Sequence, residues 1–377
     1  MDVITRNCTV PIPDYLKEHY PLEEILIFDI ETTGFSARNS QLYLIGCIYF
    51  EENSPKIRQW FAETPKEEVR LIKEFFDFLK AYRYLIHFNG NGFDIPYLTQ
   101  KADTLELNCS FSDVESIDLY KILSPFKTLL KLENLKQKTV EHYFGIDRED
   151  LYNGGELIDV YRQYIKSPDD ECKHLLLLHN HDDICGLLQL MPLLAFQDIT
   201  KEQIVFQNAR ICDYVSMEGT SKKEAYLSFS LAAPLPKPIS FAKEECYLTV
   251  HGQNGKIRVP VYTGELKFFY EDYKNYYYLP LEDTAVHKSV AEFVDKEYRQ
   301  KAKANNCYSK KNGIFLPQMS KIFSPCFQND YKDRIFYFEA SPDNLENTLR
   351  MKDYIWEIFC FLMEKNTEKK LLNVHTK

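Results

Sequence analysis

Two acidic residues interrupt the end of a mostly apolar segment, with Asp29 inside residues 22–30 and Glu31 directly after them. The segment has the length and composition of a buried β-strand, and Thr-Thr-Gly at 32–34 supplies a turn. Side chains two positions apart in a strand point to the same face, so the two carboxylates would converge. Such a pair is destabilised by repulsion and lost hydration unless a cation joins it. The spacing therefore indicates a cation site; the alternative is a strand end whose acids point into solvent.

A second acid, Asp94, follows a loop rich in glycine. Residues 86–98 are typical of a strand, a loop of sequence Asn-Gly-Asn-Gly at 89–92, and a helix with Asp94 in its first turn. Glycines in such a loop let the backbone turn tightly and let a substrate approach closely. The alternative is an acid favoured only by the positive end of the helix dipole.

A third group of polar residues lies on a helix expected to begin with Ser167 as N-cap and Pro168 in the first turn. His179 and Asp183 are four residues apart and share one helix face, whereas Asp182 points roughly 100° away from Asp183. These two side chains could act together at a site. A polar helix face around a core histidine is the alternative.

The elements that would position these residues alternate along the chain. After the strand that ends at Asp29, apolar periodicity predicts two further strands, then helices alternating with strands. The strands are expected at 22–29, 41–50, 56–63, 83–90 and 114–120, and the helices at 64–82, 93–102, 132–145 and from 167 onward. This order predicts an α/β domain with a mixed five-stranded sheet flanked by helices.

The amino-acid composition limits the classes of protein to which this chain can belong. A chain of 377 residues with 45% hydrophobic residues is expected to fold as two domains. No apolar run is long enough to span a membrane, and the first 20 residues lack the apolar core of a signal peptide. Ten cysteines without a Cys-x-x-Cys pair fit a reducing, cytoplasmic location. The net charge of −10 argues against a nucleic-acid partner, but acids gathered around bound divalent ions would remove that objection.

The domain boundaries are expected at residues 1–20 for an N-terminal extension, 21–195 for the α/β domain and 196–377 for an α+β domain of unassigned fold. The last domain contains Asn-Gly at 254–255, a hairpin signal, and a helix near its end, and the last ten residues are expected to be frayed.

A surface of this last domain could contact single-stranded nucleic acid. Tyr276, Tyr277 and Tyr278 stand near the Lys-rich residues 286–312, and aromatic rings with basic groups bind unpaired strands by stacking and phosphate contact. The predicted contacts are Lys288, Arg299, Lys301, Lys303, Lys310 and Lys311. The alternative is a set of core tyrosines beside a solvated helix face.

The three acidic groups, taken in order, resemble the RNase H-like superfamily of DEDD exonucleases, and especially its bacterial YprB-like proteins with a ribonuclease H-like domain. FDIETTG at 28–34 is similar to the first motif of the superfamily, HFNGNGFDIPYL at 87–98 to the second and HNHDDI at 179–184 to the third, and the segments at 132–150 and 154–164 are similar to its connecting regions. The resemblance covers roughly residues 22–195. It implies a 3′-5′ exonuclease that uses two Mg²⁺ or Mn²⁺ ions.

The resemblance also implies roles for residues. Asp29 would bridge both ions, Glu31 and Asp183 would complete the first, and Asp94 would hold the second through water. His179 would accept the proton of the attacking water. Members of the superfamily carry a tyrosine four residues, or a histidine five residues, before the last aspartate, so this histidine at the tyrosine spacing departs from both patterns.

Two further assignments complete the predicted site. Asp183 is preferred as the fourth carboxylate ligand, with Asp182 as the competing candidate. Thr32, Asn89 and Asn91, which lie beside the acids in sequence, are the predicted nucleic-acid contacts of this domain.

The sequence thus predicts a metal-dependent nuclease that hydrolyses phosphodiester bonds from a 3′ end, with single-stranded nucleic acid, or nucleic acid with a free 3′ end, as its partner. A metal-dependent endonuclease of the same fold and a non-catalytic nucleic-acid-binding or assembly module are the alternatives. Both DNA and RNA are compatible with the residues named.

Overall fold

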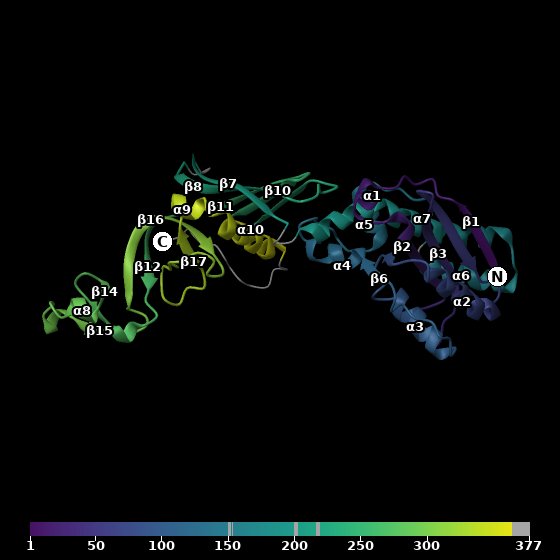
Figure 1. Cartoon of the computed structure of the whole chain (residues 1–377), viewed down its shortest axis with the longest axis horizontal. Coiled ribbons are helices and arrows are strands. Elements are labelled where there is room, and N and C mark those ends of the chain that lie inside the picture. Colours follow the sequence, from purple (N-terminus) through teal and green to yellow (C-terminus); the bar gives the residue numbers. More distant parts are fainter. Residues whose placement is uncertain (150–151, 153, 200–202, 216–218, 364–377) are drawn as a thin grey trace. The chain divides into compact units, whose positions relative to one another are not determined.

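The structure is a computed structural model that describes residues 1–149, 152, 154–199, 203–215 and 219–363. It divides into two compact units, Met1–Gln197 and Asp198–Lys377, which are described separately (Figure 1). Among the described residues, no helix combines the length and apolar character needed to cross a membrane. The ten C-terminal residues expected to be frayed lie outside the described ranges.

A six-stranded mixed sheet forms the centre of the first unit. Its strands, in spatial order, are β1 (Asp2–Asn7), β4 (Ser54–Phe61), β3 (Leu42–Glu51), β2 (Ile25–Thr32), β5 (Tyr84–His87) and β6 (Glu115–Asp118). The pairs β2–β5 and β5–β6 are parallel, and the other pairs are antiparallel. The five predicted strands and the predicted α/β class are confirmed, and β1 adds a sixth strand at the edge.

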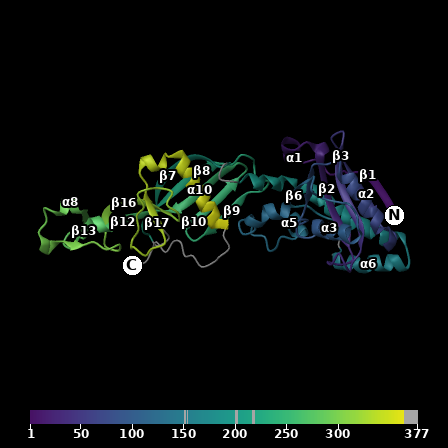
Figure 2. The ribbon, with the colours of Figure 1, turned by 60° about the horizontal axis from the view of Figure 1, so that its bottom comes forward.

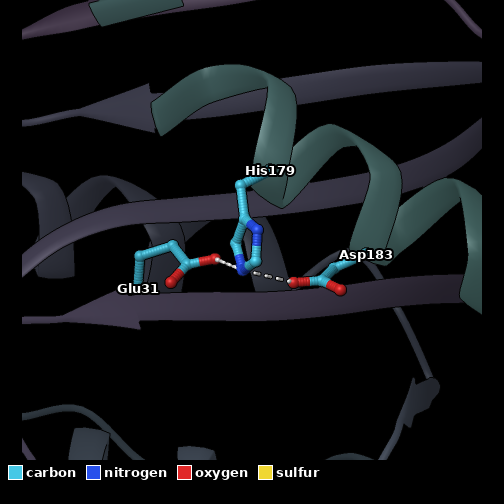
Figure 3. Close-up of side chains that lie close together, drawn as sticks. All are labelled: Glu31, His179 and Asp183. Carbon is cyan, nitrogen blue, oxygen red and sulfur yellow. Dashed lines mark ion pairs between the residues drawn. The ribbon is translucent and has the colours of Figure 1, made fainter. Parts of the chain in front are cut away.

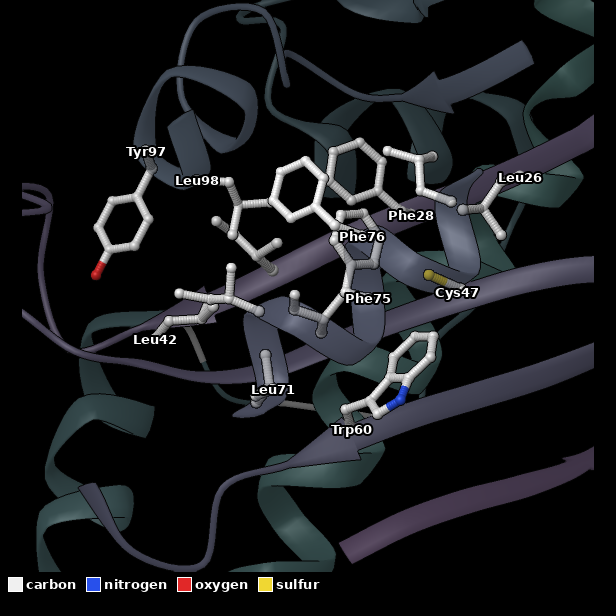
Figure 4. Close-up of a cluster of buried hydrophobic side chains, with 14 of the residues drawn as sticks. Leu26, Phe28, Leu42, Cys47, Trp60, Leu71, Phe75, Phe76, Tyr97 and Leu98 are labelled. Carbon is white, nitrogen blue, oxygen red and sulfur yellow. The ribbon is translucent and has the colours of Figure 1, made fainter. Parts of the chain in front are cut away.

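Helices cover both faces of this sheet. They are α1 (Asp14–His19), α2 (Glu68–Leu79), α3 (Asp94–Thr104), α4 (Leu119–Leu123), α5 (Gln137–Phe144), α6 (Gly154–Lys166) and α7 (Asp170–Gln189). Apolar side chains of α2 and α3 pack on one face of the sheet (Figure 4), whereas those of α6 and α7 pack on the other. Strand β3 is buried on both faces, which explains its unbroken apolar run.

Helix α7 begins later than expected. Its first helical residue is Asp170, and the side chain of Asp169 accepts a hydrogen bond from the Cys172 amide at 2.8 Å. The predicted cap at Ser167 is therefore wrong, because Asp169 is an equally good capping residue and lies closer to the apolar stripe. The helix still carries His179 and Asp183 in its central turns.

The face covered by α2 holds a dense aromatic cluster. Phe75 is fully buried, with its ring centroid 5.7 Å from that of Phe28 and 6.2 Å from that of Trp60. Phe75→Ala is expected to lower the free energy of unfolding of this unit by roughly 3–5 kcal/mol, because it removes buried surface and leaves a cavity. Urea unfolding followed by tryptophan fluorescence measures the change, in a Trp356→Phe background so that Trp60 alone reports. Phe75→Leu, which keeps most of the volume, should cost less than half as much; equal losses would contradict the packing described.

The second unit contains three antiparallel sheets. The first has the order β7 (Val205–Val215), β8 (Ser221–Ser230), β11 (Asn254–Pro260), β10 (Cys246–His251) and β9 (Ile239–Lys243). The second sheet has the order β12 (Tyr262–Phe269), β16 (Tyr308–Gln318) and β17 (Phe336–Glu339). The third sheet has the order β14 (Thr284–His287), β13 (Tyr276–Leu279) and β15 (Gln300–Lys301). The helices are α8 (Lys288–Ala291), α9 (Pro342–Leu345) and α10 (Thr348–Met363). Helix α10 lies against the five-stranded sheet (Figure 2), where Phe359 contacts Phe229 with ring centroids 5.5 Å apart.

The predicted hairpin at Asn254 and Gly255 is present, but its turn is displaced. Strand β10 ends at His251 and β11 begins at Asn254, so Gly252 and Gln253 occupy the turn. Gly252 has φ of 58°, a left-handed conformation that glycine adopts without strain. The sequence favours Asn254 and Gly255 as the turn residues, but Gly255 lies within strand β11.

Candidate active site

Strand β2 brings the first two acids to one place. Asp29 and Glu31 alternate with the buried Ile30, and the register between β2 and β3 shifts after Glu31. The pKa of Asp29 is raised well above its usual range, first by burial and then by the negative charges of Asp183, Glu31 and Asp94. These three charges come from three different segments, so the acids predicted from sequence lie within electrostatic reach of one another.

Asp94 occupies the first residue of α3, and its position depends on the loop before it. Asp118, at the end of β6, accepts hydrogen bonds from the amide of Asn89 at 2.8 Å and from that of Asn91 at 3.4 Å. The Asp94 carboxyl is buried, which raises its pKa to about 7 although backbone hydrogen bonds from Asp94 and Ile30 act in the opposite direction. The bond to Ile30 places Asp94 beside β2.

His179 lies between two carboxylates (Figure 3). Its Nε2 atom is 3.2 Å from Asp183 Oδ2 and 3.7 Å from Glu31 Oε1. Ligand atoms of Glu31, His179 and Asp183 all lie within 4.8 Å of one another. The helix spacing of four residues thus brings the histidine and aspartate together over β2, on the side where Glu31 points.

Asp182, the competing candidate, is engaged elsewhere. Its Oδ2 atom accepts a hydrogen bond from the amide of Glu149 at 3.0 Å, and its Oδ1 atom is 3.1 Å from His181 Nδ1. The charge of Asp183 is the largest of the acidic charges that raise the pKa of Asp29. Of the two neighbouring acids, Asp183 is the one that faces the cluster.

Sequence reasoning missed Arg148. Its guanidinium donates to Asp183 and to the buried Glu141, which also accepts a hydrogen bond from Gln137 at 2.8 Å. Burial alone would lower the pKa of Arg148, but its ion pairs with Glu141 and Asp183 raise it above its ordinary value. The sequence marks the segment that contains this arginine only as a connecting region between acidic motifs, and its one available signal is a basic residue at that place.

The predicted nucleic-acid contacts in the first unit lie around the acids, and two of their side chains have partners within the protein. Thr32 Oγ1 donates to the carbonyl of Gly34 at 2.9 Å, and Asn91 Oδ1 accepts from Ser116 Oγ at 2.9 Å. Asn89 has φ of 61° in the turn before α3. The loops therefore use these side chains to hold their own shape.

The basic residues predicted in the second unit fall into two groups. Lys310 pairs with Asp283 and with Glu265, and Lys311 pairs with Glu339, so both lie on β16 with acidic partners. The other four surround the small sheet of β13, β14 and β15: Lys288 begins α8, Arg299 and Lys301 lie at β15, and Lys303 follows it.

The three consecutive tyrosines do not share one surface. Tyr276 and Tyr278 pack against a cluster that includes Cys307, because alternate strand residues point to the same side. Tyr277 lies on the opposite side, paired in register with Lys301, and the Arg299 guanidinium is 5.0 Å from the centre of its ring. The expected stacking surface is thus reduced to Tyr277 with two basic neighbours.

The acids and imidazole in the first unit suit a divalent cation. Four carboxylates supply the hard oxygen ligands that Mg²⁺ and Mn²⁺ prefer, and their mutual repulsion is the cost that a cation removes. Tyr43 is fully buried nearby, and its hydroxyl makes no hydrogen bond with the described residues. The pKa of this phenol is raised by burial first and then mainly by the charge of Glu31. An unpaired buried hydroxyl beside an acidic cluster fits a site that also holds a hydrated ion.

The raised pKa of Asp94 predicts how stability depends on pH. Because the folded protein holds this proton up to about pH 7, whereas the unfolded chain releases it near pH 4, the metal-free protein should lose stability between about pH 4 and 7. Mg²⁺ or Mn²⁺ should therefore raise the melting temperature more at pH 8 than at pH 5. Differential scanning fluorimetry with and without EDTA measures this; Asp94→Asn should remove much of the difference. An equal metal effect at both pH values would contradict the prediction.

Part of the chain is similar to known proteins. Residues 26–195 match the model of the RNase_H superfamily. A stretch of 99 residues is 34% identical to DNA polymerase 1 of Sulfurisphaera ohwakuensis, covering 26% of this chain and 10% of that polymerase.

Two solved structures are similar at low identity. The family B DNA polymerase of the archaeon Pyrobaculum calidifontis shares 16% identity with a TM-score of 0.39, over 68% of this chain and 35% of that protein. The metal-free E. coli ExoI–ssDNA complex shares 12% identity with a TM-score of 0.31, over 56% of this chain and 54% of that one. This chain therefore spans a tenth to about half of the length of these proteins. The family match of residues 26–195 and their mixed, helix-flanked sheet are both consistent with an RNase H-like fold for this part of the chain.

Proposed function

We propose that this protein is a metal-dependent nuclease that removes nucleotides from the 3′ end of nucleic acid. The observation that carries the proposal is the convergence of acids from β2, α3 and α7, with the His179 imidazole between Glu31 and Asp183. A cluster of carboxylates could serve several metal-dependent reactions, and the match of residues 26–195 to the RNase_H superfamily supports nuclease activity among them.

The residues that would hold two Mg²⁺ or Mn²⁺ ions are Asp29, Glu31, Asp94 and Asp183. When bound, a pair of such ions lowers the pKa of an attacking water and stabilises the leaving oxygen of a phosphodiester. The protein's contribution is to hold the four carboxylates at one place against their repulsion. The cluster also explains why a chain with a net charge of −10 can act on a polyanion.

His179 is proposed as the group that accepts the proton of the attacking water. Its Nε2 atom faces the carboxylates, and the nitrogen of a neutral imidazole can accept a proton from a water molecule bound there. Asp183, one helical turn along α7, keeps the ring over the site. The tyrosine-like spacing of this histidine thus places a stronger base than a phenol at the same position on the helix.

Residues 21–195 are assigned as the nuclease domain and 196–377 as a domain for substrate or partner contact, with residues 1–20 as an extension that supplies β1. In the second domain, Tyr277, Arg299 and Lys301 form the surface best suited to an unpaired strand, because an aromatic ring and two cations lie side by side. The proposed substrate is single-stranded nucleic acid or a duplex with a free 3′ end.

A comparison of linear and circular strands tests the proposal. Single-stranded DNA and RNA, labelled at the 5′ end or closed into circles, are incubated with the protein and Mg²⁺ or Mn²⁺. We expect the linear strand to shorten from its 3′ end into a ladder, the circle to stay intact, and EDTA to stop the reaction. Cleaved circles would identify an endonuclease instead, and binding without cleavage of any strand would identify a non-catalytic module.

A further inference from the structure

A row of residues crosses three strands beneath the candidate site. Asp29 on β2 is paired in register with Gly46 on β3, and Gly46 is paired with Gln59 on β4. Residues directly opposite one another in a sheet point to the same face. Because neighbouring strands are about 4.8 Å apart, Asp29 and Gln59 are roughly 10 Å apart and need another side chain to connect them.

Asn180, from α7, fills the space above Gly46. A Cβ atom on Gly46 would lie 1.8 Å from Asn180 Oδ1 and 2.7 Å from its Cγ. No side chain larger than hydrogen is therefore compatible with this asparagine. Asn180 and Gln59 are both completely buried, so their amides depend on protein partners for hydrogen bonds.

The hydrogen bonds in this row run in one direction. Arg6 Nη2 donates to Gln59 Oε1 at 2.8 Å, Gln59 Nε2 donates to Asn180 Oδ1 at 2.9 Å, and Asn180 Nδ2 donates to Asp29 Oδ2 at 3.1 Å. A guanidinium can only donate, so it fixes which end of the Gln59 amide faces it. Gln59 Nε2 also donates to the carbonyl of Leu177 at 2.9 Å, which fixes the same orientation. The Asn180 amide must then present its NH₂ group to Asp29.

We propose that Asn180 is a positioning residue for Asp29, and that Gln59 and Arg6 set the orientation of its amide. This inference rests on the proposed function, in which Asp29 is one of the four carboxylates that would hold the ions. Three other carboxylates repel Asp29, so its side chain would turn away from them without a hydrogen-bond donor to hold it. Asn180 supplies that donor and holds one carboxylate oxygen in place.

The inference predicts an effect on metal affinity from residues that touch no ion. Partners that orient metal ligands typically contribute 10–100-fold to affinity. Asn180→Leu, which keeps the shape and removes the donor, should weaken Mn²⁺ binding roughly 10–100-fold. Gln59→Glu should have a similar effect by a different route: a carboxylate oxygen would replace the amide donor that faces Asn180 Oδ1, so the Asn180 amide would flip and turn its oxygen toward Asp29.

Isothermal titration of the full-length protein with Mn²⁺ tests the inference, with circular dichroism to establish that each variant is folded. Gln318→Leu is the matched control, since Gln318 is a buried glutamine of the second unit that bonds to the Phe323 backbone. We expect wild type and Gln318→Leu to bind Mn²⁺ equally and both site variants to bind more weakly. Excess Mn²⁺ should restore turnover in Gln59→Glu, because every proposed ligand is still present.

Two results would overturn the inference, and they are distinguishable. Unchanged Mn²⁺ affinity in a folded Gln59→Glu or Asn180→Leu variant, beside normal wild-type binding, would overturn the positioning role alone. If wild type itself binds no Mn²⁺, the proposed function fails and the inference fails with it. In Gln59→Glu, the new carboxylate can form an ion pair with Arg6. This variant can therefore test the inference even if Asn180→Leu does not fold.

Discussion

Asp29→Asn is expected to lower the rate of 3′-end degradation by about a thousandfold, which corresponds to a loss of roughly 4 kcal/mol of transition-state stabilisation. The substitution keeps the shape of the side chain and its place on β2 but removes one negative charge from the centre of the acidic cluster. The same variant should be more stable than wild type in EDTA, because burial and three neighbouring acids destabilise the charged Asp29 carboxylate. Single-turnover rates on a 5′-labelled strand and melting temperatures measure the two effects.

A loss of activity together with a gain in stability separates a functional acid from a structural one. Asp103→Asn is the matched control, since Asp103 is an exposed acid on α3, the helix that begins with Asp94. It should change neither rate nor stability beyond about 0.5 kcal/mol. Near-normal activity in Asp29→Asn would remove Asp29 from the metal site.

Asp183→Asn and Asp182→Asn should differ strongly although they are neighbours. Asp183 faces His179 and the acids of β2, so its neutral variant should lose at least about a hundredfold in rate. Asp182 accepts a hydrogen bond from the Glu149 amide, which an asparagine oxygen can also accept. The Asp182 variant should therefore stay within about threefold of wild type, a difference of roughly 0.7 kcal/mol.

The pair serves as its own control, because both substitutions remove one negative charge from the same turn of α7. Rates measured at several Mn²⁺ concentrations distinguish weaker metal binding from a slower chemical step. The reverse order, with Asp182→Asn inactive and Asp183→Asn active, would assign the fourth ligand to Asp182 and leave Arg148 paired with a non-catalytic acid.

Much of the first unit was predictable because its signals are local. The apolar runs of β2 and β3 reflect burial of consecutive residues, and both strands are predicted from them. Strand β1 is not predicted, since none of its six residues is buried and it pairs with β4, which lies 49 to 59 residues later in the sequence. The cap of α7 was misplaced because Ser167 and Asp169 are equivalent capping residues in sequence alone.

The residues of the candidate site were also predictable only where their signals are local in sequence. The sequence alone identifies five residues of the site, because the chemical type of each and its spacing within one strand or helix indicate a shared site: Asp29, Glu31, Asp94, His179 and Asp183. Arg148, Asn180 and Gln59 could not, since their importance lies in partners on other elements. Gly46 is the clearest case: nothing in a buried strand marks a glycine as the space for an asparagine 134 residues later.

The most direct test of the central claim is a crystal soaked in Mn²⁺ and measured near the manganese absorption edge. The account predicts two anomalous peaks about 3.5–4 Å apart among Asp29, Glu31, Asp94 and Asp183, with Asp29 in contact with both. Soaked crystals of Asp29→Asn should lack at least one peak. A wild-type map with no anomalous density among these four carboxylates, at Mn²⁺ concentrations that saturate known two-ion nucleases, would contradict the account.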